Sequence, residues 1–288
     1  MLFASRTQGA NGIPWCEPAR QACQTVAVEV IICSGVDEIG TLGADAFAAL
    51  VRRKPNAVLG LATGSSPLPV YDELARRHAA GEVSFAGCSA FTLDEYVGLP
   101  ADHPQRYRNV ITTELTGRID IDPDRVHSPD GLAEDIPAAC EAYEQAITDA
   151  GGVDLQIVGI GTDGHVAFNE PGSSLASRTR IKTLTSQTRR DNARFFDDDP
   201  EAVPHHCLTQ GLATIMAARH VLLVATGKAK SEAVHQLVEG PVSAMWPATI
   251  LQCHPHVTVL VDGAAGSRLA LADYYRETYA AKPAWQGV

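Results

Sequence analysis

The chain has 288 residues, 45% of them apolar, which is enough to bury the core of one large α/β domain. Its formal net charge of −11 argues against nucleic acids and anionic membranes as partners, because both require a basic protein surface. Seven cysteines, odd in number and without a C-x-x-C pair, indicate neither a disulfide framework nor a zinc ribbon and favour reduced thiols.

The N-terminal residues 1–26 are rich in Gly, Pro, Gln and small polar side chains and are predicted to form a flexible extension. The chain has no apolar run of roughly 18 residues and no basic start followed by an apolar stretch. We therefore expect a cytoplasmic protein without a membrane anchor. Residues 27–288 are predicted to form a single α/β domain.

Short β-rich apolar runs alternate with longer amphipathic stretches from residue 28 onward. The runs predict strands at 28–33, 57–63, 89–95, 154–161, 220–226 and 256–262. Apolar residues three and four apart predict helices at 38–53, 67–80, 131–150 and 228–239. This alternation predicts a doubly wound, open, mostly parallel sheet of the Rossmann-like kind, in three αβα layers. Such sheets bind ligands beyond the carboxyl ends of their strands, so the loops there are candidate sites.

The segment 172–208 differs from its surroundings because it is polar, contains several charges and shows no sustained period. A long irregular segment inside a domain often forms a lid, which we expect at about 180–208. A solvated insertion would have the same composition, and both interpretations stay open here.

The first of these loops, Thr63, Gly64, Ser65 and Ser66, precedes a predicted helix. Gly64 allows the backbone to approach a ligand, and hydroxyls beside free helix N–H groups suit a phosphate. No Gly-Lys-Ser/Thr follows, so the loop does not indicate a nucleoside triphosphate. The alternative is an ordinary serine cap with a proline in the first turn.

Acidic side chains follow two further strands. Asp94 and Glu95 end the predicted strand 89–95, where a partly desolvated carboxylate either acts as a base near neutral pH or caps the next segment. Asp163, His165 and Glu170 lie within eight residues after the strand 154–161. Two carboxylates flanking a histidine can orient the imidazole and raise its basicity, which is typical of acid/base chemistry.

Two other patterns are rejected as sites. Residues 159–164 match G-x-G-x-x-G, but Pro171 and Gly172 interrupt the chain where a dinucleotide fingerprint should open a long helix. A metal site built from residues 205–207, His254 and His256 lacks an acidic partner at ligand spacing. Neither pattern predicts a nucleotide or a metal.

Five motifs in sequence order resemble the glucosamine-6-phosphate deaminase family over about residues 28–275: LATGSSPLPVYDEL, FTLDEYVGLP, GIGTDGHVAFNEP, SSLASRTRIKTLT and NARFFD. The resemblance implies a sugar-phosphate isomerase fold. It also implies isomerisation and deamination of glucosamine 6-phosphate to fructose 6-phosphate and ammonia in amino-sugar catabolism. Such a reaction needs a positioned base and charge stabilisation, so we expect no cofactor and no metal.

The resemblance also implies roles for single residues. Asp94 matches the proton-abstracting aspartate and His165 the ring-opening histidine, which Asp163 and Glu170 support. The residues matching the substrate-binding positions are Thr63, Gly64, Ser65 and Ser66 for the phosphate, Arg194 and Lys230 as cations, and Gly159 and Ala167 beside the sugar.

In allosteric members of the family, N-acetylglucosamine 6-phosphate binds between subunits. The matching residues here are Ser173, Arg180, Lys182, Thr183 and a C-terminal tyrosine, Tyr274 or Tyr275. We therefore expect a homo-oligomer, with a hexamer as one form, and a small sugar phosphate as the partner rather than a nucleic acid or membrane. The rival functions are a 6-phosphogluconolactonase or related isomerase and a non-catalytic sugar-phosphate sensor. The DEYVGLP stretch argues against the first, and the acid/base set argues against the second.

Overall fold

A computed structural model describes residues 28–283 and 286–288, and the predicted extension 1–26 lies outside them. Its main sheet has seven strands in which every neighbouring pair is parallel, which confirms the predicted fold class. The order across the sheet is β1 (Glu29–Cys33), β10 (Val257–Asp262), β9 (Val221–Ala225), β6 (Leu155–Val158), β2 (Val58–Leu61), β3 (Ser89–Thr92) and β5 (Val126–His127). Continuous apolar runs form the central strands because helices cover both faces of a parallel sheet.

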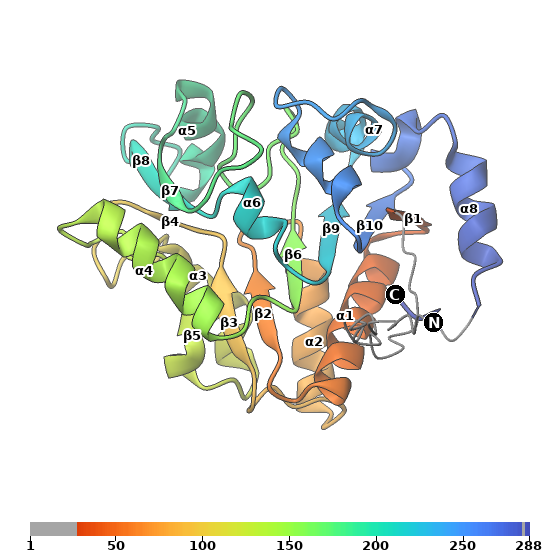
Figure 1. The fold of residues 1–288 in the computed structure, drawn as a ribbon, viewed down its shortest axis with the longest axis horizontal. Helices are drawn as coiled ribbons and strands as arrows, with labels where there is room; N and C mark the ends of the chain where they lie inside the picture. The colour runs from red at the N-terminus through yellow and green to blue at the C-terminus, as the bar shows by residue number, and fades with distance from the viewer. Residues whose placement is uncertain (1–27, 284–285) are drawn as a thin grey trace, which may run out of the picture.

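Helices lie around this sheet, and four of them coincide with the predicted amphipathic stretches (Figure 1). The α-helices are α1 (Val36–Arg53), α2 (Leu68–Ala79), α3 (Tyr107–Glu114), α4 (Ile136–Asp149), α5 (Ser186–Asn192), α6 (Leu212–Ile215), α7 (Ser231–Glu239) and α8 (Ala272–Ala280). The 3₁₀ turns are η1 (Thr116–Arg118), η2 (Pro123–Arg125), η3 (Ala193–Phe195), η4 (Lys228–Lys230), η5 (Pro247–Cys253) and η6 (Ala265–Arg268). Acidic residues in the first turn of α1 and arginines in its last turn complement the helix dipole.

A second, antiparallel sheet corrects two of the sequence expectations. Its strands are β4 (Asp94–Tyr96), β8 (His206–Thr209) and β7 (Arg180–Thr183), in that order. The predicted strand 89–95 is therefore two strands, because the chain leaves the main sheet at Leu93. The segment 172–208 is not irregular, since it contains β7, α5, η3 and most of β8. The strand pattern was missed because β7 is half exposed and polar, and its pairing with β8 spans more than twenty residues.

The second sheet lies beyond the carboxyl ends of the main strands, at the upper left of Figure 1. It encloses a small apolar core of its own, which includes Tyr96, Phe168, Leu184 and Phe196. This unit covers the edge of the main sheet at which ligands bind in such folds. Within the described residues, no helix is both long and apolar enough to cross a membrane.

Candidate active site

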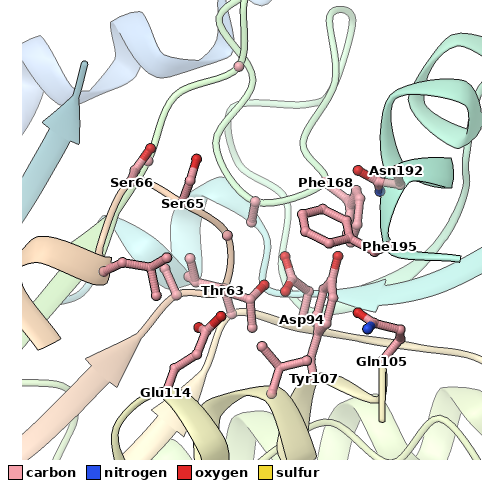
Figure 2. Close-up of a pocket in the computed structure, with 18 of the residues that line it drawn as sticks. Thr63, Ser65, Ser66, Asp94, Gln105, Tyr107, Glu114, Phe168, Asn192 and Phe195 are labelled. Atoms are coloured by element: carbon pink, nitrogen blue, oxygen red, sulfur yellow. The ribbon is translucent and has the colours of Figure 1, made fainter. Parts of the chain in front are cut away.

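A cavity of about 740 Å³ opens between the carboxyl edge of the main sheet and the second sheet. Figure 2 shows side chains entering it from the loop after β2, from β4 and from the region of α5. Ten of the predicted site residues line it: Thr63, Gly64, Ser65, Ser66, Asp94, Gly159, His165, Ala167, Arg194 and Lys230. Residues more than 160 positions apart in sequence therefore meet in one site, as the sheet topology requires.

The loop after β2 presents free hydroxyls to this cavity. Pro67 occupies the N-cap position of α2, and the helix has no side-chain cap, so the alternative of an ordinary serine cap does not apply. Gly64 has a φ of +93°, a conformation that glycine adopts without strain. Within the described residues, no hydrogen bond engages the side chains of Thr63, Ser65 or Ser66, so all three are available to a ligand.

Two cations also line the cavity. Arg194 lies on η3 with its guanidinium 4.6 Å from the centre of the Phe195 ring, and Lys230 ends η4. Burial lowers the pKa of Lys230 and nearby Arg194 adds to this effect, while Asp163 opposes it. Neither cation is in an ion pair with a described carboxylate. Unpaired cations beside hydroxyls and a helix N-terminus form a suitable site for a phosphate.

Asp94 stands across the cavity on β4 and is 6% exposed. Figure 2 shows its carboxylate projecting toward the centre of the cavity. Burial and the neighbouring charge of Glu95 raise the pKa of Asp94 to about 8. No described group donates a hydrogen bond to this carboxylate, so the described residues do not compensate its charge. Such a group can take up a proton from a bound molecule near neutral pH.

Adjacent residues on a strand point to opposite faces, which separates the two acids of the Asp94–Glu95 pair. The Glu95 carboxylate is fully buried and accepts hydrogen bonds from the backbone N–H groups of Tyr107 (2.9 Å) and Arg108 (3.0 Å) at the start of α3. The sequence left open whether an acid here is a base or a cap. The two roles fall on different residues, because Asp94 faces the cavity and Glu95 caps α3.

His165 lies on a tight turn that positions its ring over Gly161. The Gly161 N–H donates to the His165 carbonyl at 2.8 Å, and a Cβ at Gly161 would approach the imidazole to 2.2 Å. The glycines of the rejected dinucleotide pattern therefore serve this turn. Asp163 Oδ1 lies 2.7 Å from His165 Nδ1. Burial favours the neutral acid, but the hydrogen bond and charge of His165 outweigh it and lower the pKa of Asp163.

Glu170 does not share the contact with the imidazole that Asp163 makes. It is buried, lies outside the cavity lining and accepts a hydrogen bond from the hydroxyl of Thr188 on α5. This contact ties the loop after β6 to the segment predicted as a lid. Ala167, which lies between His165 and Glu170 in the sequence, lines the cavity. Its φ of +52° is a strained conformation for a residue with a Cβ.

The sequence reasoning missed several residues of the cavity wall, among them Gln105, Tyr107, Glu114, Asn192 and Phe195. The Tyr107 hydroxyl donates to the Tyr96 hydroxyl at 3.3 Å, and the Asn192 amide donates to the same oxygen at 3.0 Å. The cavity walls formed by α3 and α5 thus meet at Tyr96. No local pattern marked these positions, because α3 was not predicted and their approach depends on the second sheet.

The residues matched to an effector site lie in two separate places. Arg180, Lys182 and Thr183 are on β7, and Ser173 is buried nearby in sequence. Tyr274 and Tyr275 are on α8, which lies at the opposite side of the molecule from β7 in Figure 1. A site that used both groups would need a second copy of the chain.

Comparison with known proteins identifies the family of the chain. The sequence profile of the family described as glucosamine-6-phosphate isomerases/6-phosphogluconolactonase matches residues 36–260. Proteins named glucosamine-6-phosphate deaminase from Mycolicibacterium smegmatis and Beutenbergia cavernae are 72% and 71% identical over 261 residues, which cover 91% of this chain and all of each relative.

Solved structures give the same grouping. A structure described as a monomeric glucosamine-6-phosphate deaminase has 42% identity and a TM-score of 0.81, over 83% of this chain and 99% of that one. A 6-phosphogluconolactonase from Thermotoga maritima, at 24% identity and a TM-score of 0.64 over 82% of this chain and 99% of that one, shares the fold. The chain belongs to the glucosamine-6-phosphate isomerase/6-phosphogluconolactonase family.

Proposed function

We propose that the chain is a glucosamine-6-phosphate deaminase, which isomerises its substrate and releases ammonia to give fructose 6-phosphate. The observation that carries this proposal is the buried Asp94 carboxylate, which accepts no hydrogen bond from the described residues and faces a cavity that Arg194 and Lys230 also line. The relatives at 72% and 71% identity are named for this activity and match along their whole length.

Substrate binding follows from the two ends of the cavity. The phosphate binds to the hydroxyls and N–H groups of residues 63–66 and to the side chains of Arg194 and Lys230. Charge-assisted hydrogen bonds of this kind are the strong ones in protein sites. The sugar then extends toward Asp94, and the backbone at Gly159 and Ala167 lies beside its hydroxyl groups.

The reaction begins with ring opening. His165, oriented by Asp163 at 2.7 Å, moves a proton between the C1 hydroxyl and the ring oxygen, so that the C1–O5 bond breaks and C1 becomes an aldehyde. Glu170 acts on this pair only through the loop that it shares with His165, which its hydrogen bond from Thr188 ties to α5. In that role Glu170 positions the histidine loop and the lid rather than the imidazole itself.

Asp94 then carries the isomerisation. Its ionised carboxylate takes the proton from C2 while the aldehyde oxygen gains a proton from solvent, which gives an enolamine. Asp94 then returns its proton to C1, and the nitrogen at C2 loses a proton to solvent, which leaves an imine at C2. Water adds to the imine carbon, and the C2–N bond breaks to release ammonia and leave the ketone of fructose 6-phosphate. The raised pKa of Asp94 matches this task, because a base is most effective when its pKa lies near the working pH.

The rival 6-phosphogluconolactonase activity would need water activation but no base at C2. The test is to incubate the purified protein with glucosamine 6-phosphate, without added metal or cofactor, and to measure ammonia and fructose 6-phosphate together. Equal amounts of both products are expected. Hydrolysis of 6-phosphogluconolactone without ammonia release would support the rival, and binding without any product would support a sensor.

The homo-oligomer, the effector site for N-acetylglucosamine 6-phosphate and the cytoplasmic location stay predictions. The separation of β7 from α8 supports an effector site formed between chains, whereas the relative at 42% identity is described as monomeric. Light scattering and rate measurements with and without N-acetylglucosamine 6-phosphate test both points. A monomer whose rate does not respond to this sugar would remove the effector site from the proposal.

A further inference from the structure

Glu95 makes an unusually complete set of contacts for a buried carboxylate. Its side chain is 0% exposed. Oε1 accepts from the N–H groups of Tyr96 and Tyr107, each at 2.9 Å, and Oε2 accepts from Arg108 N–H at 3.0 Å. The guanidinium Nε of Arg106 lies 3.6 Å from Oε2. Burial raises the pKa of Glu95 above its ordinary value, and the three N–H groups and Arg106 offset part of this cost by favouring the charged form.

These contacts replace the missing cap of α3. The N-cap residue of this helix is Arg106, and its side chain makes no capping hydrogen bond. The first two helical N–H groups, on Tyr107 and Arg108, are bound instead by a carboxylate from β4, twelve and thirteen residues earlier. A negative group at this end also interacts favourably with the helix dipole. The position of the first turn of α3 therefore depends on Glu95.

That first turn forms part of the substrate cavity. Gln105 and Tyr107 line it from the start of α3, and Val110, Thr113 and Glu114 line it further along the same helix. Figure 2 shows the Tyr107 side chain beside Asp94 and Gln105 to the right of both. Glu95 thus connects the strand that carries Asp94 to the helix that forms the wall next to it.

Glu95 is also the charged group nearest to Asp94 in sequence, and its charge adds to burial in raising the pKa of Asp94. The other titratable groups near Asp94 on the packed elements are Tyr96 on β4, Tyr107 on α3, Tyr143 on α4 and Cys207 on β8. Burial raises the pKa of all four, so they are uncharged at neutral pH. The charged or titratable side chains on the other cavity walls are Glu114, His165, Arg194 and Lys230.

We propose that Glu95 is a positioning residue with two separable effects: its buried carboxylate fastens the first turn of α3 to β4, and its negative charge acts on Asp94, the adjacent residue of the same strand. The inference rests on the proposed deaminase function, because it assigns Glu95 a part in the same reaction. Glu95 touches neither the cavity nor the substrate, and it acts through Tyr107 and Asp94.

Two substitutions separate these effects. Glu95→Gln removes the charge and sets an amide NH₂ against the Arg108 N–H. We expect the rising limb of the kcat/KM pH profile to move down by about one pH unit, since a nearby like charge shifts a pKa by about that much or more. We also expect KM to rise about fivefold, the equivalent of about 1 kcal/mol for a lost helix cap.

Glu95→Asp keeps the charge but shortens the side chain by one methylene, so it no longer reaches both N–H groups of α3. KM should rise about as much as in Glu95→Gln. The rising limb of the kcat/KM pH profile should stay within about half a pH unit of its position in the unmodified chain. Glu141→Gln is the matched control, because it removes one negative charge from an exposed position on α4. Neither KM nor the limb should change in that variant.

The outcomes are distinct from failure of the proposed function, which the unmodified protein tests by its products. An unchanged KM in both Glu95 variants would show that Glu95 does not hold the first turn of α3 in place. An unchanged rising limb of the pH profile in Glu95→Gln would show that the charge of Glu95 does not act on Asp94. If Glu95→Gln does not fold, Glu95→Asp decides alone, since unchanged KM there refutes the inference. A purely structural role would lower the amount of folded protein without moving the pH profile.

Discussion

Replacement of Asp94 by asparagine tests the electrostatics of the site in the absence of substrate. The pKa of Asp94 is about 8 in the folded chain against an ordinary value of 3.8. Below about pH 4 the Asp94 carboxyl is protonated in both the folded and the unfolded state. Between about pH 4 and 8 it is protonated only in the folded state. The unfolded state therefore binds fewer protons in this window, and the free energy of unfolding falls as the pH rises through it.

The size of this change in the free energy of unfolding follows from the same pKa shift of Asp94. A difference of about four pH units corresponds to an upper limit of about 6 kcal/mol, at about 1.4 kcal/mol per unit. Water entering the open cavity raises the effective dielectric, so we expect about 3 kcal/mol of this to be measurable. Asparagine has a similar shape and no proton to lose, so Asp94→Asn should be more stable than the original chain above pH 8 and equal to it near pH 4.

Urea unfolding at about pH 5, 6.5 and 8 measures this difference directly. Asp102→Asn, at an exposed position, is the control for the change in net charge. The Asp94→Asn variant should also bind the sugar phosphate without turning it over. A stability difference between the two chains that stays constant within about 0.5 kcal/mol from pH 5 to pH 8 would refute the reasoning, because it would mean that Asp94 has an ordinary pKa.

Three further predictions concern the phosphate, the histidine turn and acid stability. Lys230→Ala should raise KM for the sugar phosphate about tenfold to a hundredfold, as expected for a charge-assisted hydrogen bond of about 1.5–3 kcal/mol, and steady-state rates check this. Gly161→Ala should lower kcat while far-UV circular dichroism stays unchanged, because its methyl group would meet the His165 ring at 2.2 Å. Burial and neighbouring histidines lower the pKa of His220 to about 3, so stability should fall as the pH drops below about 6.5. His220→Gln should reduce that fall in melting temperature, and an equal fall in both chains would contradict it.

The sequence by itself determined the main sheet and the loops that carry the chemistry. Short continuous apolar runs such as 220–226 favour buried strands, and their alternation with amphipathic helices leaves few arrangements other than a parallel sheet. Since the carboxyl ends of parallel strands share one edge, the loops holding Ser65, Asp94 and His165 were bound to converge.

Only the tertiary structure decided which groups contact one another and how they titrate. Asp163, two residues from His165, contacts the imidazole, whereas Glu170 accepts a hydrogen bond from Thr188 on α5. The exposed strand β7 and the helix α3 gave no clear pattern because their partners are distant in sequence. The pKa of Asp94 depends on burial by elements from the whole chain and on Glu95 facing away from it, and no local pattern encodes solvent exclusion.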